Sequence, residues 1–107
     1  MSSRNAYLSQ SDQRSATVLS RSLERARREI EAGETDVVRL AAAVRSVIEK
    51  EPSVALDYAE IVDADTLEPA MTLRKPCYVL LAAKVGGTRL IDNALIEPAG
   101  DSFIVTI

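Results

Sequence analysis

Histidine and tryptophan are missing from this sequence of 107 residues, and cysteine occurs only once, at Cys77. Without histidine, the chain cannot assemble a Ser-His-Asp or Cys-His catalytic relay from its own residues. A single cysteine excludes an internal disulfide and a zinc site built from several cysteines. With three tyrosines and one phenylalanine, the chain has few aromatic rings on which single-stranded nucleic acid could stack. These absences exclude most of the side-chain chemistry on which small enzymes rely.

Long apolar runs are also missing. The longest strongly apolar run, residues 77–83, is far shorter than the ~20 residues that span a bilayer. The first five residues contain no apolar segment of the signal-peptide type. A single cysteine within an apolar run suits a reducing compartment. We therefore expect a cytoplasmic protein with no membrane partner.

The net charge of −3 is unevenly distributed. Residues 1–50 carry a net charge of +2, whereas residues 51–107 carry −5. This balance argues against a strongly basic nucleic-acid-binding protein. It also indicates that the two parts of the chain are built differently.

Arg21, Arg25 and Arg28 share one helical face and could suggest a patch that binds nucleic acid or lipid. However, Glu24–Arg28 and Arg25–Glu29 are i,i+4 pairs, which are typical of a solvated surface that neutralises its own charge. We expect no nucleic-acid partner. A weak nucleic-acid binder that uses this face stays as an alternative hypothesis.

The first part of the chain has the pattern of two helices. Apolar residues recur at spacings of three and four over residues 16–30, and Gly33 is well placed to end that helix. A second stripe covers residues 37–48, with Thr35 or Asp36 at its start. A short connection containing glycine predicts that the two helices pack antiparallel.

The second part has the pattern of strands. Residues 55–63 alternate, residues 77–85 read as a strand buried on both faces, and residues 88–97 form a third strand. Gly86-Gly87 fits a two-residue hairpin turn, and residues 102–107 are compatible with a short terminal strand. We predict one α+β domain spanning the whole chain: two or more N-terminal helices packed on a small, mainly antiparallel three-stranded sheet.

The acidic residues near the first strand do not predict a metal site. Strand alternation would place Asp57 and Asp63 on one face and Glu60 on the other, so their carboxylates would not converge. Cys77 begins an apolar strand and is expected to be a buried small hydrophobic residue rather than a nucleophile.

The N-terminal segment, Met1 to Asn5, is the strongest candidate for a binding site. The hydroxyls of Ser2 and Ser3 can donate to phosphate oxygens, and Arg4 supplies a permanently charged, bidentate guanidinium. The glycines and the lysine of a P-loop are absent. The alternative interpretation is an ordinary chain terminus with small polar residues.

A family resemblance favours the phosphate site. Met-Ser-Ser-Arg-Asn-x-Tyr-Leu, residues 1–8, resembles the conserved loop of the pantothenate synthetase (pantoate–β-alanine ligase) family. Similar segments follow in the same order: Asp12-Gln13-Arg14, Asp57-Tyr58 and Thr88-Arg89-Leu90-Ile91-Asp92-Asn93. Together they cover about residues 1–98, and their order and spacing are specific.

The resemblance implies a reaction and a set of site residues. Members of this family condense pantoate and β-alanine to pantothenate through a pantoyl-adenylate, using ATP and Mg²⁺. Ser2 and Ser3 would hydrogen-bond the ATP phosphates, and Met1 would contribute through its backbone. Arg4, as the catalytic residue, would offset charge that builds on the pyrophosphate leaving group.

The sequence matches only part of the family's pattern. The family's histidine-containing nucleotide motif and pantoate pocket belong to an N-terminal Rossmann-type domain, which this sequence does not include. We therefore expect residues 1–107 to be the C-terminal, lid-forming domain, inactive alone, and we leave its homo-oligomerisation open. The alternative is a free-standing interaction module with no catalytic role. For Arg89, Asp92 and Asn93 we expect a structural role at a strand or domain interface.

Overall fold

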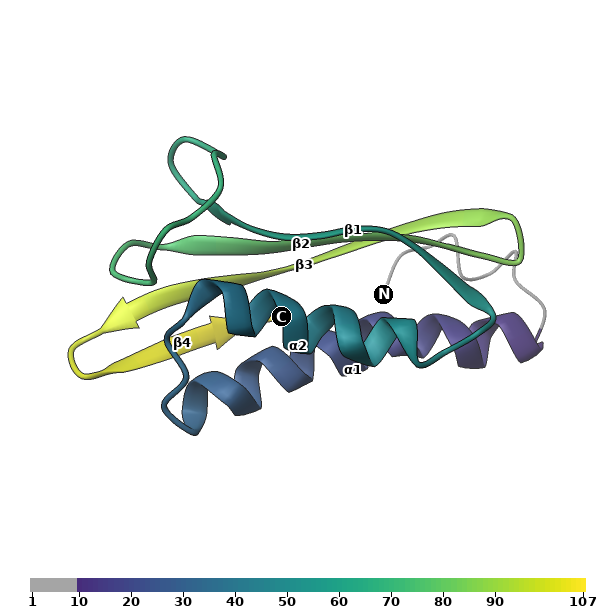
Figure 1. Cartoon of the computed structure of the whole chain (residues 1–107), viewed down its shortest axis with the longest axis horizontal. Coiled ribbons are helices and arrows are strands. Elements are labelled where there is room, and N and C mark those ends of the chain that lie inside the picture. Colours follow the sequence, from purple (N-terminus) through teal and green to yellow (C-terminus); the bar gives the residue numbers. More distant parts are fainter. Residues whose placement is uncertain (1–9) are drawn as a thin grey trace.

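The computed structural model describes residues 10–107, with side chains from Thr17 onwards. Two helices cover one face of a four-stranded antiparallel sheet (Figure 1). The strands follow one another in the sheet in chain order. The elements are α1 (Gln10–Glu31), α2 (Val37–Glu49), β1 (Val54–Asp63), β2 (Cys77–Val85), β3 (Thr88–Ala99) and β4 (Ser102–Thr106). The predicted α+β class is confirmed.

The prediction of three strands is wrong, because the C-terminal segment forms a fourth. β4 has only five residues, and Pro98 and Gly100 before it are typical of a chain that leaves a sheet. Instead, Pro98 lies within β3 opposite Phe103, and Gly100 makes the turn with a φ of 64°. Phe103 and Val105 pack against the core, which explains why this short strand forms.

Both helices have well-defined ends. At the end of α1, Gly33 has a φ of 102°, its N–H donates to the carbonyl of Ile30, and the N–H of Glu34 donates to the carbonyl of Glu29. These are the two bonds of a Schellman motif, which needs the positive φ of glycine. At the start of α2, the Asp36 carboxylate accepts from the N–H groups of Val38 and Arg39. Within residues 10–107, neither helix is both long enough and apolar enough to cross a membrane.

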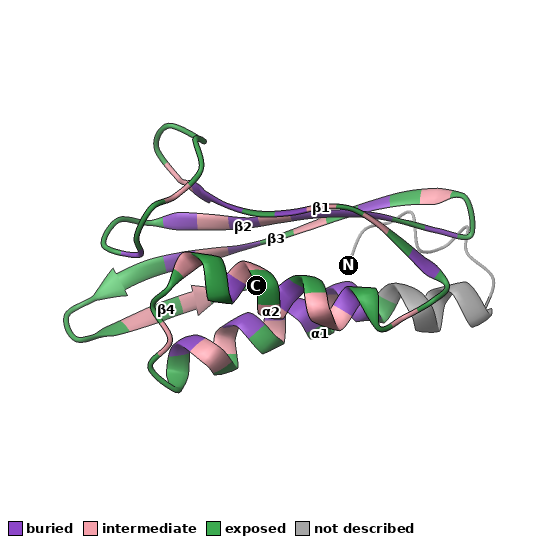
Figure 2. Cartoon of the chain, viewed as in Figure 1, coloured by how far each residue is buried: buried purple, intermediate pink, exposed green. Residues whose placement is uncertain are grey.

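The core lies between the helices and the sheet face that they cover, which we call the inner face (Figure 2). The described side chains of both predicted helical stripes are buried in it or packed against it, and burial of each leucine or isoleucine side chain contributes roughly 1.5–3 kcal/mol. Every odd-numbered residue of β2 also faces this core. The buried set includes Leu19, Leu23, Ala26 and Ile30 on α1, Leu40, Val44 and Ile48 on α2, and Cys77, Val79, Leu81, Ala83 and Val85 on β2.

A β-bulge in β1 changes which residues face the core. The pairing with β2 shifts between Leu56 and Tyr58, so Asp57 is the extra residue. Leu56 packs against the core before the bulge, and after it the buried inner residues are Ala59 and Ile61. The uninterrupted alternation predicted for this strand is therefore wrong, because one inserted residue reverses the faces.

Two connections require backbone conformations with positive φ. Gly86 and Gly87 have φ values of 57° and 80°, which confirms the predicted two-residue hairpin between β2 and β3. In the longer loop after β1, Leu67 has a φ of 62° and is 63% exposed. Its N–H donates to the carbonyl of Asp63 at 2.8 Å, which closes the turn. Leucine therefore occupies a left-handed position that glycine would occupy with less strain.

We predict that Leu67→Gly stabilises the protein by about 0.5–1 kcal/mol, because release of left-handed strain exceeds the entropic cost of glycine. Thermal unfolding followed by circular dichroism should show a midpoint raised by a few degrees, about 2–5 °C. Leu67→Ala removes the same exposed side chain but keeps the strain, so it should give no rise. Equal effects of the two substitutions would show that the backbone is not strained here.

Candidate functional site

The predicted phosphate-binding residues, Met1, Ser2, Ser3 and Arg4, lie outside the described residues. The structure describes the support that follows them in sequence, because α1 begins at Gln10. Helix α1 is held against the sheet by its buried stripe and by the guanidinium of Arg27, whose Nη2 donates to the Val105 carbonyl at 2.9 Å. The segment that carries the predicted site is therefore attached to an anchored helix.

Residues from two of the sequence motifs that carry the resemblance form a cluster across the sheet. Nη2 of Arg89 on β3 lies 2.9 Å from Oδ2 of Asp57 on β1, and its guanidinium carbon lies 5.9 Å from the centre of the Tyr58 ring. The bulge at Asp57 puts this carboxylate within reach of Arg89. Both charged side chains are about half-exposed, so this pair contributes at most about 1 kcal/mol. Its main consequence is to fix the arrangement of three side chains on one surface.

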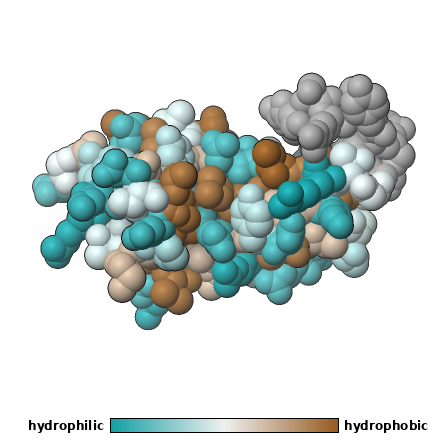
Figure 3. All heavy atoms as spheres, turned by 90° about the horizontal axis from the view of Figure 1, so that it is seen from above, coloured by the Kyte–Doolittle hydropathy of each residue, from teal (hydrophilic) through white to brown (hydrophobic). Residues whose placement is uncertain are grey.

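That surface is the outer face of the sheet, which the helices leave uncovered (Figure 1). Ala82 lies on this face in register between Tyr58 and Ile91, and it is fully buried, whereas Ile91 is 61% exposed. Figure 3 shows apolar side chains gathered across the middle of this face, among polar ones. The prediction that residues 77–85 are buried on both faces is confirmed for the inner face. On the outer face, Ala82 is buried and Tyr78 and Leu80 are half-buried, but Lys84 is exposed.

The charged residues of α1 behave as a solvated surface. Arg25 pairs with Glu29 at 2.7 Å, as predicted, whereas Glu24 pairs with Arg27 at 2.9 Å rather than with Arg28. These exposed pairs neutralise part of the positive charge of the helix face.

The acidic residues near β1 do not converge. Among the described residues, no three cysteine or acidic side chains gather closely enough to hold a metal ion. Asp57 turns towards Arg89, whereas Oδ1 of Asp63 accepts from the N–H groups of Asp65 at 2.8 Å and Thr66 at 3.2 Å. These two bonds lower the pKa of Asp63. The prediction that Asp57 and Asp63 share a face is wrong, because the bulge lies between them.

Cys77 is a structural residue. It is 1% exposed, and burial raises the pKa of its thiol, with a smaller contribution in the same direction from the Asp63 carboxylate. A protonated, inaccessible thiol is a poor nucleophile. The prediction of a buried small hydrophobic residue is confirmed.

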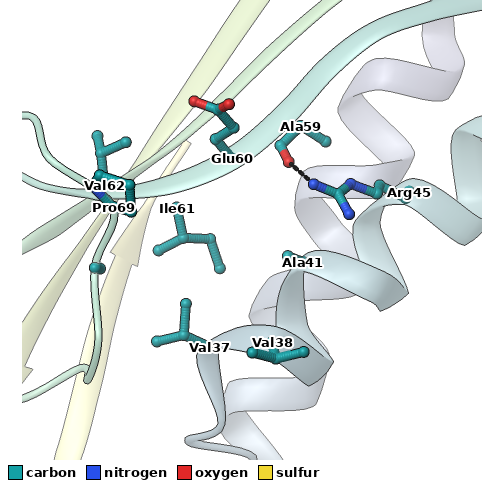
Figure 4. A pocket seen from close by; sticks show the side chains of 10 residues that line it. Val37, Val38, Ala41, Arg45, Ala59, Glu60, Ile61, Val62 and Pro69 are labelled. Atoms are coloured by element: carbon teal, nitrogen blue, oxygen red, sulfur yellow. Dashed lines mark hydrogen bonds between the residues drawn. The ribbon is translucent and has the colours of Figure 1, made fainter.

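A hollow that the sequence did not reveal lies between α2 and β1 (Figure 4). It has a volume of about 250 Å³, and its lining combines apolar side chains with polar groups, including the guanidinium of Arg45 at one side. Arg45 donates from Nη2 to the carbonyl of Ala59 at 3.1 Å. In the sequence, the only signal was Arg45 next to the apolar stripe of the second helix. Its hydrogen-bond partner, Ala59, lies on a strand, and the sequence does not show that this strand packs beside the helix.

Comparison with known proteins shows which family this chain belongs to. The family model described as pantoate-beta-alanine ligase matches residues 1–95, from the N-terminal segment to within β3. The chain belongs to the pantoate–β-alanine ligase family. The family resemblance that the sequence motifs indicated is therefore confirmed. Strand β4 follows the matched residues and completes the sheet of this family member.

The similar proteins are about three times as long as this chain. The pantothenate synthetase of Koribacter versatilis is 47% identical over 102 residues, which are 95% of this chain and 35% of that protein. That of Heliobacterium modesticaldum is 48% identical over 97 residues, which are 91% of this chain and 34% of that protein. The crystal structure of pantothenate synthetase from Thermus thermophilus superposes with a TM-score of 0.79 at 32% identity, covering 87% of this chain and 33% of that one. The chain thus spans about a third of these ligases.

We predict a pH dependence that comes from Asp63. Its folded-state pKa is lowered, so its ionised form contributes stability at neutral pH, and this contribution is lost as the pH falls below about 4, through the folded pKa. Asp63→Asn keeps an oxygen that can accept both N–H groups but does not titrate. Urea unfolding at several pH values should show the original protein losing more stability below pH 4 than this variant does.

Because the other carboxylates titrate equally in both proteins, the difference between the two stability curves reports Asp63 alone. Parallel curves from pH 7 to pH 2 would contradict the role given to the two N–H bonds.

Proposed function

We propose that this chain is the C-terminal part of a pantothenate synthetase, an ATP-dependent ligase that joins pantoate and β-alanine through a pantoyl-adenylate. The observation that carries the proposal is the family match over residues 1–95, because it includes the Met-Ser-Ser-Arg segment together with its supporting domain. The TM-score of 0.79 supports the same domain architecture. On this proposal, the chain supplies part of an ATP site rather than a whole one.

In this proposal, the N-terminal segment binds the phosphates of ATP. Ser2 and Ser3 donate hydrogen bonds to ATP phosphate oxygens, and Met1 contributes its backbone. Arg4 stabilises the charge that develops on pyrophosphate as the carboxylate of pantoate attacks the α-phosphorus. The segment precedes the N-terminus of α1, whose partial positive charge also favours a nearby anion.

Mg²⁺ is assigned to the ATP phosphates and to the remainder of the ligase. Among the side chains that the structure describes, from residue 17 to residue 107, no acidic cluster offers the oxygen ligands that Mg²⁺ prefers. The ion, when bound with ATP, would neutralise phosphate charge. The residues of this chain would add hydrogen bonds and the fixed positive charge of Arg4.

We also propose a lid role, which the surfaces of the domain support. The outer face of the sheet exposes an apolar band with the Arg89–Asp57 pair beside it, and such a face is suited to close against a second body. We propose that it closes over ATP held by the other part of the ligase. The chain alone would then be inactive, because it lacks the groups that bind adenosine and pantoate.

We predict that Arg4→Ala in the full-length ligase that carries this segment slows adenylate formation by about 10²–10³-fold, the cost of losing a transition-state charge stabiliser. The measurement is the rate of pyrophosphate release with saturating pantoate and ATP. Arg39→Ala, at an arginine whose side chain is 76% exposed on α2, is the matched control and should leave the rate unchanged.

Arg4→Lys keeps the charge but loses the bidentate geometry, so it should retain part of the rate. Circular dichroism should show the same fold for all variants. An unchanged rate of pyrophosphate release in Arg4→Ala would contradict the assigned role.

A further inference from the structure

The hollow between α2 and β1 has the composition of a small binding site. Its walls are apolar side chains of the helix and the edge strand, chiefly Val37, Ala41 and Ile61, and Figure 4 shows Val37 and Ile61 facing each other across it. Its volume of about 250 Å³ suits a ligand of only a few carbon atoms.

The charge at this site is unbalanced. Arg45 lies at one side of the hollow, and among the described residues no carboxylate lies within 4.0 Å of its guanidinium. Arg45 is an exposed residue, and its hydrogen bond to the Ala59 carbonyl uses one of five N–H donors, so the others are open to an anion from solvent. Glu60 also borders the hollow, but its carboxylate points away from Arg45 (Figure 4). An anionic group is the complement that this arrangement lacks.

The edge of β1 adds backbone donors. The carbonyls of Ala59 and Ile61 point away from β2, because they accept from Arg45 and from the N–H of Ala70. In a strand, the N–H of each residue leaves on the same side as its carbonyl. The N–H groups of Ala59 and Ile61 therefore face the hollow, and neither has a hydrogen-bond acceptor among the described residues. A buried N–H without a partner is costly, so an acceptor is expected here.

We propose that this groove binds the carboxylate of a small branched aliphatic acid. One carboxylate oxygen would accept from Arg45 and the other from an edge N–H of β1, while the branched alkyl group lies between Val37, Ala41 and Ile61. The site uses none of the residues of the N-terminal phosphate segment, and its occupation does not depend on the proposed ligase function.

Other ligand classes fit less well. An extended peptide that adds a strand to β1 would need free carbonyls, but those of Ala59 and Ile61 are already bonded. The returning loop also already pairs with β1 at Val62 and Pro69, which leaves no room for a continuous strand. A neutral apolar ligand would leave both Arg45 and the N–H donors unmatched, and an organic cation would be repelled by Arg45.

The test is an NMR titration of the ¹⁵N-labelled 107-residue chain with isovalerate at neutral pH. We expect saturable shifts of the Ala59 and Ile61 amides, with a dissociation constant of about 1–10 mM for so small a ligand. Isovaleramide has the same shape without the charge and should bind about tenfold more weakly. Acetate carries the charge without the branched group and should also bind more weakly, because it buries less apolar surface.

Two variants separate the site from general surface binding. Arg45→Gln should weaken isovalerate binding by about fivefold or more, whereas Arg39→Gln on the same helix should leave it unchanged. Ala41→Leu fills the groove with a good helix former and should abolish the shifts without unfolding α2. The proposal is overturned if neither amide shifts up to about 50 mM isovalerate, five times the weakest affinity expected here. It is also overturned if acid and amide bind equally, or if Ala41→Leu binds as the original chain does.

Discussion

Helices α1 and α2 share a single core with one face of β2, and the rest of the molecule depends on this contact. Leu23, Leu40 and the odd-numbered residues of β2 lie in one buried cluster. Because side chains alternate along a strand, burial of this face directs the even-numbered residues to the outer side. The same packing fixes α1 beneath the sheet and so determines where the N-terminal segment joins the domain.

Two surfaces follow from that arrangement. The outer face of the sheet has no helix over it. On this face the Asp57 carboxylate, at the bulge in β1, pairs with Arg89 and does not lie on the same face as Asp63. The edge of β1 is covered at its carbonyls by Arg45 and by the returning loop, which leaves donors and a cation around the groove. On the proposed function, the first surface would close against the remainder of the ligase. The second is suited to a small anion.

Much of this fold could be predicted from the sequence, because local patterns carried it. The helical stripes, the Asp36 cap, the Gly33 end and the Gly86-Gly87 turn are each determined by neighbouring residues. The bulge in β1 could not be predicted, since it depends on pairing with residues distant in sequence. For the same reason, the pattern of residues 102–107 was compatible with a terminal strand but did not establish that it joins the sheet. The groove at Arg45 was missed for the same reason. The phosphate-binding segment was predicted from its motif and stays a prediction, because Met1 to Arg4 lie outside the described residues.

On the proposed function, this chain brings part of an ATP site to a ligase and cannot bind ATP tightly alone. The most direct measurement is an NMR titration of the 107-residue chain with ATP and Mg²⁺. We expect shifts at Ser2, Ser3 and Arg4 with a dissociation constant in the range of about 1 mM, because contacts to adenine and ribose are missing. Sub-micromolar affinity, or shifts confined to residues 10–107, would contradict the proposed role.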